Sequence, residues 1–81
     1  MSLTVLLFAA ARDIAGTDSI AIELSEAATV ADLRAELARR MPALAVLLAK
    51  SAIAVNQDFA EGGLILEPTD EVAIIPPVSG G

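Results

Sequence analysis

The 81-residue sequence predicts an α+β fold in which a mixed β-sheet packs on one main helix. Three observations indicate this class. Short β-rich apolar runs stand near both ends of the chain, a longer segment between them has apolar residues at helical spacing, and the predicted order of elements is β-β-α-β-(β)-β. The first and last runs are the most continuously apolar. We therefore expect them to be parallel neighbours at the centre of the sheet, joined by a crossover that contains the helix.

The first third of the chain predicts a β-hairpin. Residues 3–8 are apolar at nearly every position, so this strand should be covered on both faces. Residues 9–18 are expected to form a loop with its turn at Gly16. Residues 19–24 alternate between apolar and polar side chains, which predicts an edge strand with one buried face, paired with the first strand.

The main helix is predicted to begin after Thr29, a favourable N-cap residue. Asp32 stands three residues later, where its carboxylate can bond back to the N-cap and face the positive end of the helix. Glu36 and Arg40 have the i,i+4 spacing of an ion pair, and Pro42 is expected to end the helix at or near Arg40. The apolar stripe that should face the core consists of Val30, Leu33, Leu37 and Met41.

Beyond the main helix, apolar residues predict a second short helix over residues 43–50. Two strands are expected over residues 52–55 and 71–75, while residues 64–66 fit either a short strand or a single helical turn. Turn residues separate these elements over residues 56–58, 61–63 and 68–70.

The composition excludes several kinds of functional site. The absence of cysteine and histidine removes disulfides, thiolate and ordinary zinc sites, iron–sulfur clusters and Ser-His triads. Eleven acidic residues against five basic ones give a net charge of −6, unlike the basic surface of a nucleic-acid binder. The apolar run at residues 3–11 has no basic flank before it and is too short for a membrane span, which favours a strand over a signal peptide. We therefore expect a cytoplasmic protein without a bound metal or cofactor.

The final six residues differ from the rest of the chain. Two prolines withhold backbone donors and stop the preceding strand, whereas two glycines leave a thin thread that can enter a narrow channel. We expect a folded domain over residues 1–75 that presents the carboxylate of Gly81 on an extended tail over residues 76–81. An inert end made of small residues is the alternative. The tail consists of Pro76, Pro77, Val78, Ser79, Gly80 and Gly81.

One face of the sheet is predicted to be apolar without cover from this chain. The first and last strands carry apolar side chains on both faces, but the predicted helices cover only one. An exposed apolar patch usually marks a binding surface. The candidate anchors are Phe8, Phe59 and Ile75, and ordinary core positions remain the alternative, above all for Phe59.

Several motifs carry a resemblance to a known family. They are Phe8-Ala9 with Arg12, Gly16-Thr17, Val55-Asn56 and, most specifically, the ending Pro-Pro-Val-Ser-Gly-Gly that follows Asp70-Glu71-Val72. With these motifs the whole chain resembles the small subunit of molybdopterin synthase, a ubiquitin-like β-grasp sulfur carrier. It departs from that family at Ile74 and Ile75, where aromatic residues are frequent, and at Thr69, where glycine is common.

The resemblance implies a chemistry for the tail. An ATP-dependent, ubiquitin-activating-like enzyme would adenylate Gly81, and sulfur would then replace an oxygen to give a thiocarboxylate. The large synthase subunit would take in the tail, and the sulfur would pass to cyclic pyranopterin monophosphate to build the dithiolene of molybdopterin. ATP would serve the activating enzyme and not bind this chain. The chain would thus be the sulfur-donor subunit of a two-subunit sulfurtransferase, without a general base of its own.

The resemblance also implies roles for individual residues. Gly81 would carry the reacting carbon, with Gly80 keeping the chain slim beside it, and the two prolines would set the direction of the tail. The residues implied to contact the large subunit are Phe8, Arg12, Phe59 and Ile75.

Three other functions remain open. A sulfur carrier for thiazole synthesis has the same fold and ending, although the Pro-Pro-Val-Ser segment disfavours it. A protein modifier would join Gly81 to lysines of target proteins. A plain β-grasp interaction module would have a tail without chemistry.

Overall fold

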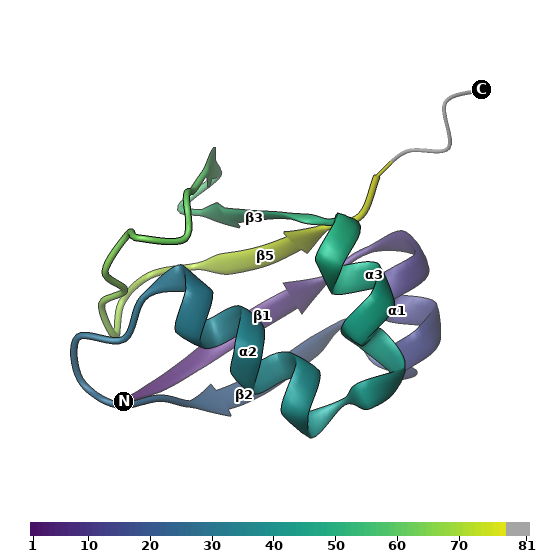
Figure 1. Cartoon of the computed structure of the whole chain (residues 1–81), viewed down its shortest axis with the longest axis horizontal. Helices are drawn as coiled ribbons and strands as arrows, with labels where there is room; N and C mark the ends of the chain where they lie inside the picture. Colours follow the sequence, from purple (N-terminus) through teal and green to yellow (C-terminus); the bar gives the residue numbers. More distant parts are fainter. Residues whose placement is uncertain (78–81) are drawn as a thin grey trace.

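The computed structural model describes residues 1–77, and these form one mixed sheet with helices packed across one face (Figure 1). The strand order is β2-β1-β5-β3-β4. Four predicted tail residues, Val78, Ser79, Gly80 and Gly81, lie outside the described residues. The elements are β1 (Ser2–Leu7), α1 (Ala9–Ala15), β2 (Ser19–Glu23), α2 (Val30–Arg40), the 3-10 turn η1 (Pro42–Leu44), α3 (Ala45–Lys50), β3 (Ala52–Val55), β4 (Asp58–Phe59) and β5 (Val72–Ile75).

The first and last strands pair at the centre of the sheet, as predicted. β1 and β5 run parallel, with Val5 opposite Val72 and Leu7 opposite Ile74. β2 pairs antiparallel with β1, and β3 pairs antiparallel with the other side of β5. β5 therefore has a neighbour on both sides, and its position depends on hydrogen bonds to two strands that are remote in sequence.

The core lies between the sheet and the helices. Alternate side chains of β1, β3 and β5 meet the apolar stripe of α2, and each buried aliphatic side chain contributes about 1.5–3 kcal/mol. Three of the four predicted stripe residues are fully buried; Met41 follows the last helical residue and packs at the edge of the core. The central members of the core are Leu3, Val5, Leu7, Val30, Leu33, Leu37, Ile53, Val72 and Ile74.

The predicted start and end of the main helix are confirmed. The Thr29 amide donates to Asp32 Oδ2 at 2.9 Å, and the Asp32 amide donates to Thr29 Oγ1 at 3.2 Å, which together form a capping box. α2 ends at Arg40, two residues before Pro42. The predicted second helix is also present, as the turn η1 followed by α3.

The loop predicted over residues 9–18 is wrong for its first part, because residues 9–15 form helix α1. Its N-cap residue is Phe8, whose side chain makes no capping hydrogen bond, so the sequence lacks the usual start signal. Its alanines favour helix, and Ala11 is fully buried in the core. Gly16 ends α1 in the left-handed conformation, with φ of 74°, and its amide bonds to the Arg12 carbonyl at 2.9 Å, so its prediction as the turn residue is confirmed.

Residues 64–66 form neither of the two elements predicted for them. They cross the start of α2 in an extended path, with a single bridge between Ile65 and Thr29. Leu66 is buried, whereas Leu64 and Ile65 are exposed.

Among the helices formed by residues 1–77, none has the length and apolar character needed to cross a bilayer.

Candidate docking face and root of the tail

The predicted tail starts at the end of the central strand. The pairing of β5 with β3 stops at Ile75 opposite Ala52, and its pairing with β1 stops at Ile74 opposite Leu7. Pro76 follows directly and is half-buried, while Pro77 is exposed. Since proline has no backbone N–H, it cannot extend the ladder. The chain therefore leaves the sheet at the C-terminal end of β5, beside the C-terminal end of β1 (Figure 1).

An apolar surface covers the side of the sheet that faces away from the helices. Its residues have the opposite parity to the core residues of the same strands, so they point to the other face. They line a shallow hollow of about 350 Å³, with Gln57 and Glu71 at its rim. We call this surface the docking face; it consists of Leu6, Phe8, Ala54, Phe59, Ala73 and Ile75.

The structure brings three of the predicted contact residues together on this face. Phe8 follows β1, Ile75 ends β5 and Phe59 belongs to β4, and all three line the same hollow. Phe8 is 46% exposed and Phe59 is 78% exposed. The alternative that Phe59 is a core residue is therefore wrong, since a core phenylalanine would be almost fully covered.

Arg12 lies beside the docking face. It belongs to α1, its side chain is exposed, and its Nε is 3.9 Å from Asp13 Oδ1. A smaller hollow of about 280 Å³ connects Arg12 with Leu6 and Phe8. A partner that covers Phe8 would thus meet the guanidinium group at the margin of the contact.

A hydrogen-bonded clasp that the sequence reasoning missed sets the start of β5. The Asn56 side chain donates from Nδ2 to Asp70 Oδ1 and accepts at Oδ1 from the Glu71 amide, both at 2.9 Å. The Glu67 amide donates to Asp70 Oδ2 at 2.8 Å. These bonds tie the β3–β4 turn to the residues before β5. Asparagine and aspartate in predicted turns were the only available signal, because the pairing spans 14 residues.

The strongest electrostatic feature lies on α2, away from the docking face. Arg39 and then Arg40 donate hydrogen bonds to the Glu36 carboxylate and lower its pKa from 4.5 to about 2. The predicted pair of Glu36 and Arg40 is confirmed, with 3.0 Å between Nε and Oε2. Among residues 1–77, no three acidic side chains converge as ligands for a metal ion. The charged residues of α2 therefore lie outside the docking face.

Comparison with known proteins places this geometry in a family context. A family model described as the ThiS family matches residues 5–81. A molybdopterin synthase sulfur carrier subunit from Chlamydomonas reinhardtii is 39% identical over 83 residues, which cover 100% of both chains.

Two solved structures resemble the whole chain. The crystal structure of SAMP1 from Haloferax volcanii has a TM-score of 0.88 at 29% identity, over 100% of both chains. A chain in the complex of subunits 1 and 2 of molybdopterin-converting factor from Helicobacter pylori has a TM-score of 0.73 at 24% identity and 100% coverage of both chains, and it shares the fold.

Proposed function

Because the chain belongs to the ThiS family, we propose that it is a sulfur carrier that delivers sulfur from Gly81 in molybdopterin synthesis. The expected ubiquitin-like β-grasp fold and the resemblance to molybdopterin synthase sulfur carriers are confirmed. The name of the relative from Chlamydomonas, which matches over the full length of both chains, supports this pathway.

The proposed chemistry takes place at the Gly81 carboxylate. A carboxylate is a poor acyl donor, so an activating enzyme would first join it to AMP from ATP, releasing pyrophosphate. A sulfur donor would then displace AMP and leave a thiocarboxylate. The sulfur would finally pass to cyclic pyranopterin monophosphate in the large synthase subunit. In this scheme the folded domain binds the partner and directs the tail, and the partner supplies the catalytic groups.

The observation that carries the proposal is that the root of the tail adjoins the docking face. Pro76 follows Ile75, which itself lines the apolar hollow. Residues 76–81 can span at most about 20 Å when fully extended. A large subunit that covers Phe8, Phe59 and Ile75 would therefore have its active site within this distance of the sheet edge.

Intact mass spectrometry tests the proposed chemistry. The purified chain would be incubated with an activating enzyme, ATP and a sulfur source. We expect a mass gain equal to the exchange of one oxygen for sulfur, localised to Gly81 by fragmentation. A variant with one alanine appended after Gly81 should gain no sulfur. An unchanged mass for the native chain, or equal sulfur gain in the extended variant, contradicts the proposal.

The similarity to SAMP1, named small archaeal modifier protein 1, supports a second candidate function. In that case Gly81 would form isopeptide bonds with lysines of other proteins. ATP-dependent conjugates of higher mass in cell extract would support this function.

A reconstituted assay with each acceptor enzyme separates the molybdopterin pathway from thiazole synthesis. Sulfur delivered only to a thiazole-forming enzyme would contradict the molybdopterin assignment.

A further inference from the structure

A second hollow lies at the end of the sheet remote from the root of the tail. It has a volume of about 600 Å³ and is bordered by the β3–β4 hairpin and the segment that follows it. Phe59 borders both this hollow and the docking face. We call it the acidic groove and define it by Asp58, Phe59, Glu61, Leu64, Ile65 and Glu67.

Apolar side chains in the groove are exposed although their backbone is held in place. Leu64 is 45% exposed and Ile65 is 59% exposed. The Val30 amide donates to the Leu64 carbonyl at 3.0 Å, and the Leu66 amide donates to the Ala28 carbonyl at 2.8 Å. Both residues are thus presented by a segment that is bonded to the start of α2. An apolar surface kept exposed in this way has the character of a contact site.

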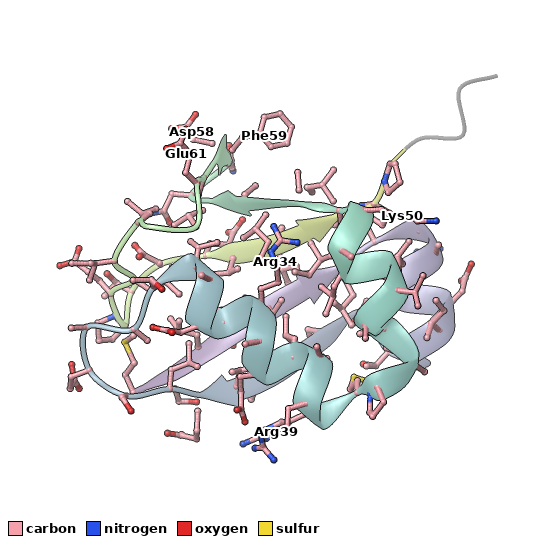
Figure 2. The ribbon with its side chains drawn as sticks, in the orientation of Figure 1. Arg34, Arg39, Lys50, Asp58, Phe59 and Glu61 are labelled. Carbon is pink, nitrogen blue, oxygen red and sulfur yellow. The ribbon has the colours of Figure 1, made fainter. Side chains whose placement is uncertain are left out.

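The groove carries negative charge that no described residue neutralises. Asp58, Glu61 and Glu67 border it, and within residues 1–77 none of the three takes part in an ion pair. The sequence contains five acidic residues and no lysine or arginine after Lys50. Figure 2 shows Asp58 and Glu61 beside Phe59 at the β4 end, while Arg34, Arg39 and Lys50 belong to the helical layer. The field at the groove therefore favours a cationic partner.

We propose that the acidic groove docks a segment of the large synthase subunit that combines basic side chains with an apolar one. This inference rests on the proposed function. Phe59 joins the groove to the docking face, so a partner that covers the docking face continues into the groove without a break. The negative charge of the groove favours basic side chains in the partner segment. Leu64 and Ile65 favour an apolar side chain between these basic residues.

The second contact gives the groove a role in orientation. The groove lies at the start of β5, where the Asn56 amide bonds to the Glu71 carbonyl, whereas the tail leaves from the other end of this strand. Contacts at both ends of β5 prevent the partner from rotating on the apolar face. The tail is thereby aligned with the active site of the partner.

Binding kinetics of the full chain with its large subunit test the proposal. Glu61→Gln and Glu67→Gln should each lower the association rate about three-fold at low salt and weaken its salt dependence, because they remove steering charge. The control is Glu23→Gln, which removes an exposed charge from β2 at the opposite edge of the sheet and should leave the rate unchanged. Glu23 Oε2 is 3.9 Å from the N-terminal amine, a pair that lies away from the groove. The double variant Leu64→Ser/Ile65→Ser should raise the dissociation rate about ten-fold.

A contact measurement complements the kinetics. Carbodiimide joins a carboxylate to a lysine amine only where the two are in contact, so we expect links from Glu61 or Glu67, and none from Glu23, in the complex. Groove variants that bind like Glu23→Gln, or links confined to the control residue, overturn the groove proposal while leaving the proposed function intact. Complete absence of binding by the native chain contradicts the proposed function itself. If the groove variants bind the large subunit normally but bind the activating enzyme more weakly, the choice of the large subunit as partner is wrong.

Discussion

At the scale of single residues, the β3–β4 turn combines one favourable and one unfavourable side chain. Asn56 and Gln57 have φ angles of 52° and 72°, the positive values found at both central positions of a type I′ turn. Asparagine tolerates this conformation, and its side chain also forms the clasp with Asp70. Gln57 has no such advantage, so the turn stores a small local strain.

We predict that Gln57→Gly stabilises the protein. The left-handed conformation costs about 1–2 kcal/mol for an ordinary side chain, and glycine avoids this cost. Glycine also gives the unfolded chain more conformational entropy, which lowers the stability by about 0.5–1 kcal/mol. The expected net gain is about 0.5–1 kcal/mol in the free energy of unfolding, measured by urea denaturation. Gln57→Ala is the control and should change little, because alanine has the same conformational penalty. A less stable glycine variant would contradict the interpretation.

We predict that Glu36 contributes stability that depends on pH. Its pKa is about 2 in the folded chain because of Arg39 and Arg40, and 4.5 is the ordinary value expected after unfolding. A folded pKa below the unfolded one stabilises the protein above pH 4.5, and this contribution is lost as the pH falls through about 2. Glu36→Gln should therefore lower the melting temperature at pH 7 and much less at pH 2.

The carboxylate is on the surface, where salt screens the interaction, so the difference should shrink in high salt. The control is Glu26→Gln, because Glu26 is an exposed glutamate without a described ion pair. A melting difference for Glu36→Gln that is as large at pH 2 as at pH 7 would assign its effect to helix propensity or packing.

At the scale of elements, Arg34 connects α2 with the end of α3. Its guanidinium Nη1 donates to the carbonyls of Leu48 and Ser51, the latter at 3.0 Å. β3 begins at the next residue, Ala52, which is paired with Ile75 at the end of β5. One side chain of the main helix thus helps to hold the strand beside the root of the tail.

We predict that Arg34→Ala destabilises the fold by about 2 kcal/mol, since hydrogen bonds from a charged donor are worth about 1.5–3 kcal/mol. Arg34→Lys should have an intermediate effect, because an ammonium group lacks the planar fork of arginine. Urea denaturation measures both. Arg12→Ala is a control for removal of an exposed arginine, whose Nε lies 3.9 Å from Asp13 Oδ1. An equal loss in all three variants would refute a specific role for Arg34.

At the scale of the whole molecule, the apolar residues on the two faces of the sheet have different roles. The side chains that face α2 stabilise the fold, and those on the opposite side form the docking face. Core residues such as Leu37 are fully buried, whereas Phe8 and Phe59 remain exposed. Substitutions on the two sides should therefore separate stability from binding.

We predict that Phe59→Ala weakens binding to the large subunit at least ten-fold with little change in unfolding free energy, because an aromatic anchor contributes mainly once it is covered. Leu37→Ala should instead cost about 2–5 kcal/mol of stability, since it leaves a cavity. Calorimetric titration and urea denaturation would measure the two quantities. A stability loss for Phe59→Ala as large as that for Leu37→Ala would contradict the division.

Much of the fold was predictable from the sequence because its signals are local. The capping box of Thr29 and Asp32, the stop at Pro42 and the alternation in β2 each depend on residues a few positions apart. The pairing of β1 with β5 was also predictable, since continuously apolar strands are typical of the centre of a sheet. The expected cover on both faces was wrong, because only alternate residues of these strands are buried. The apolar docking face followed from the same reasoning.

The tertiary structure decided the features that depend on residues far apart in the chain. Helix α1 exists because Ala11 packs into the core, residues 64–66 follow the start of α2, and Asn56 meets Asp70 across a turn. The exposure of Phe59 and the formation of the acidic groove have the same origin. By itself the sequence determined which segments form the main helix and the principal strands, whereas packing determined which side chains remained uncovered, because burial is a property of neighbours in space rather than in sequence.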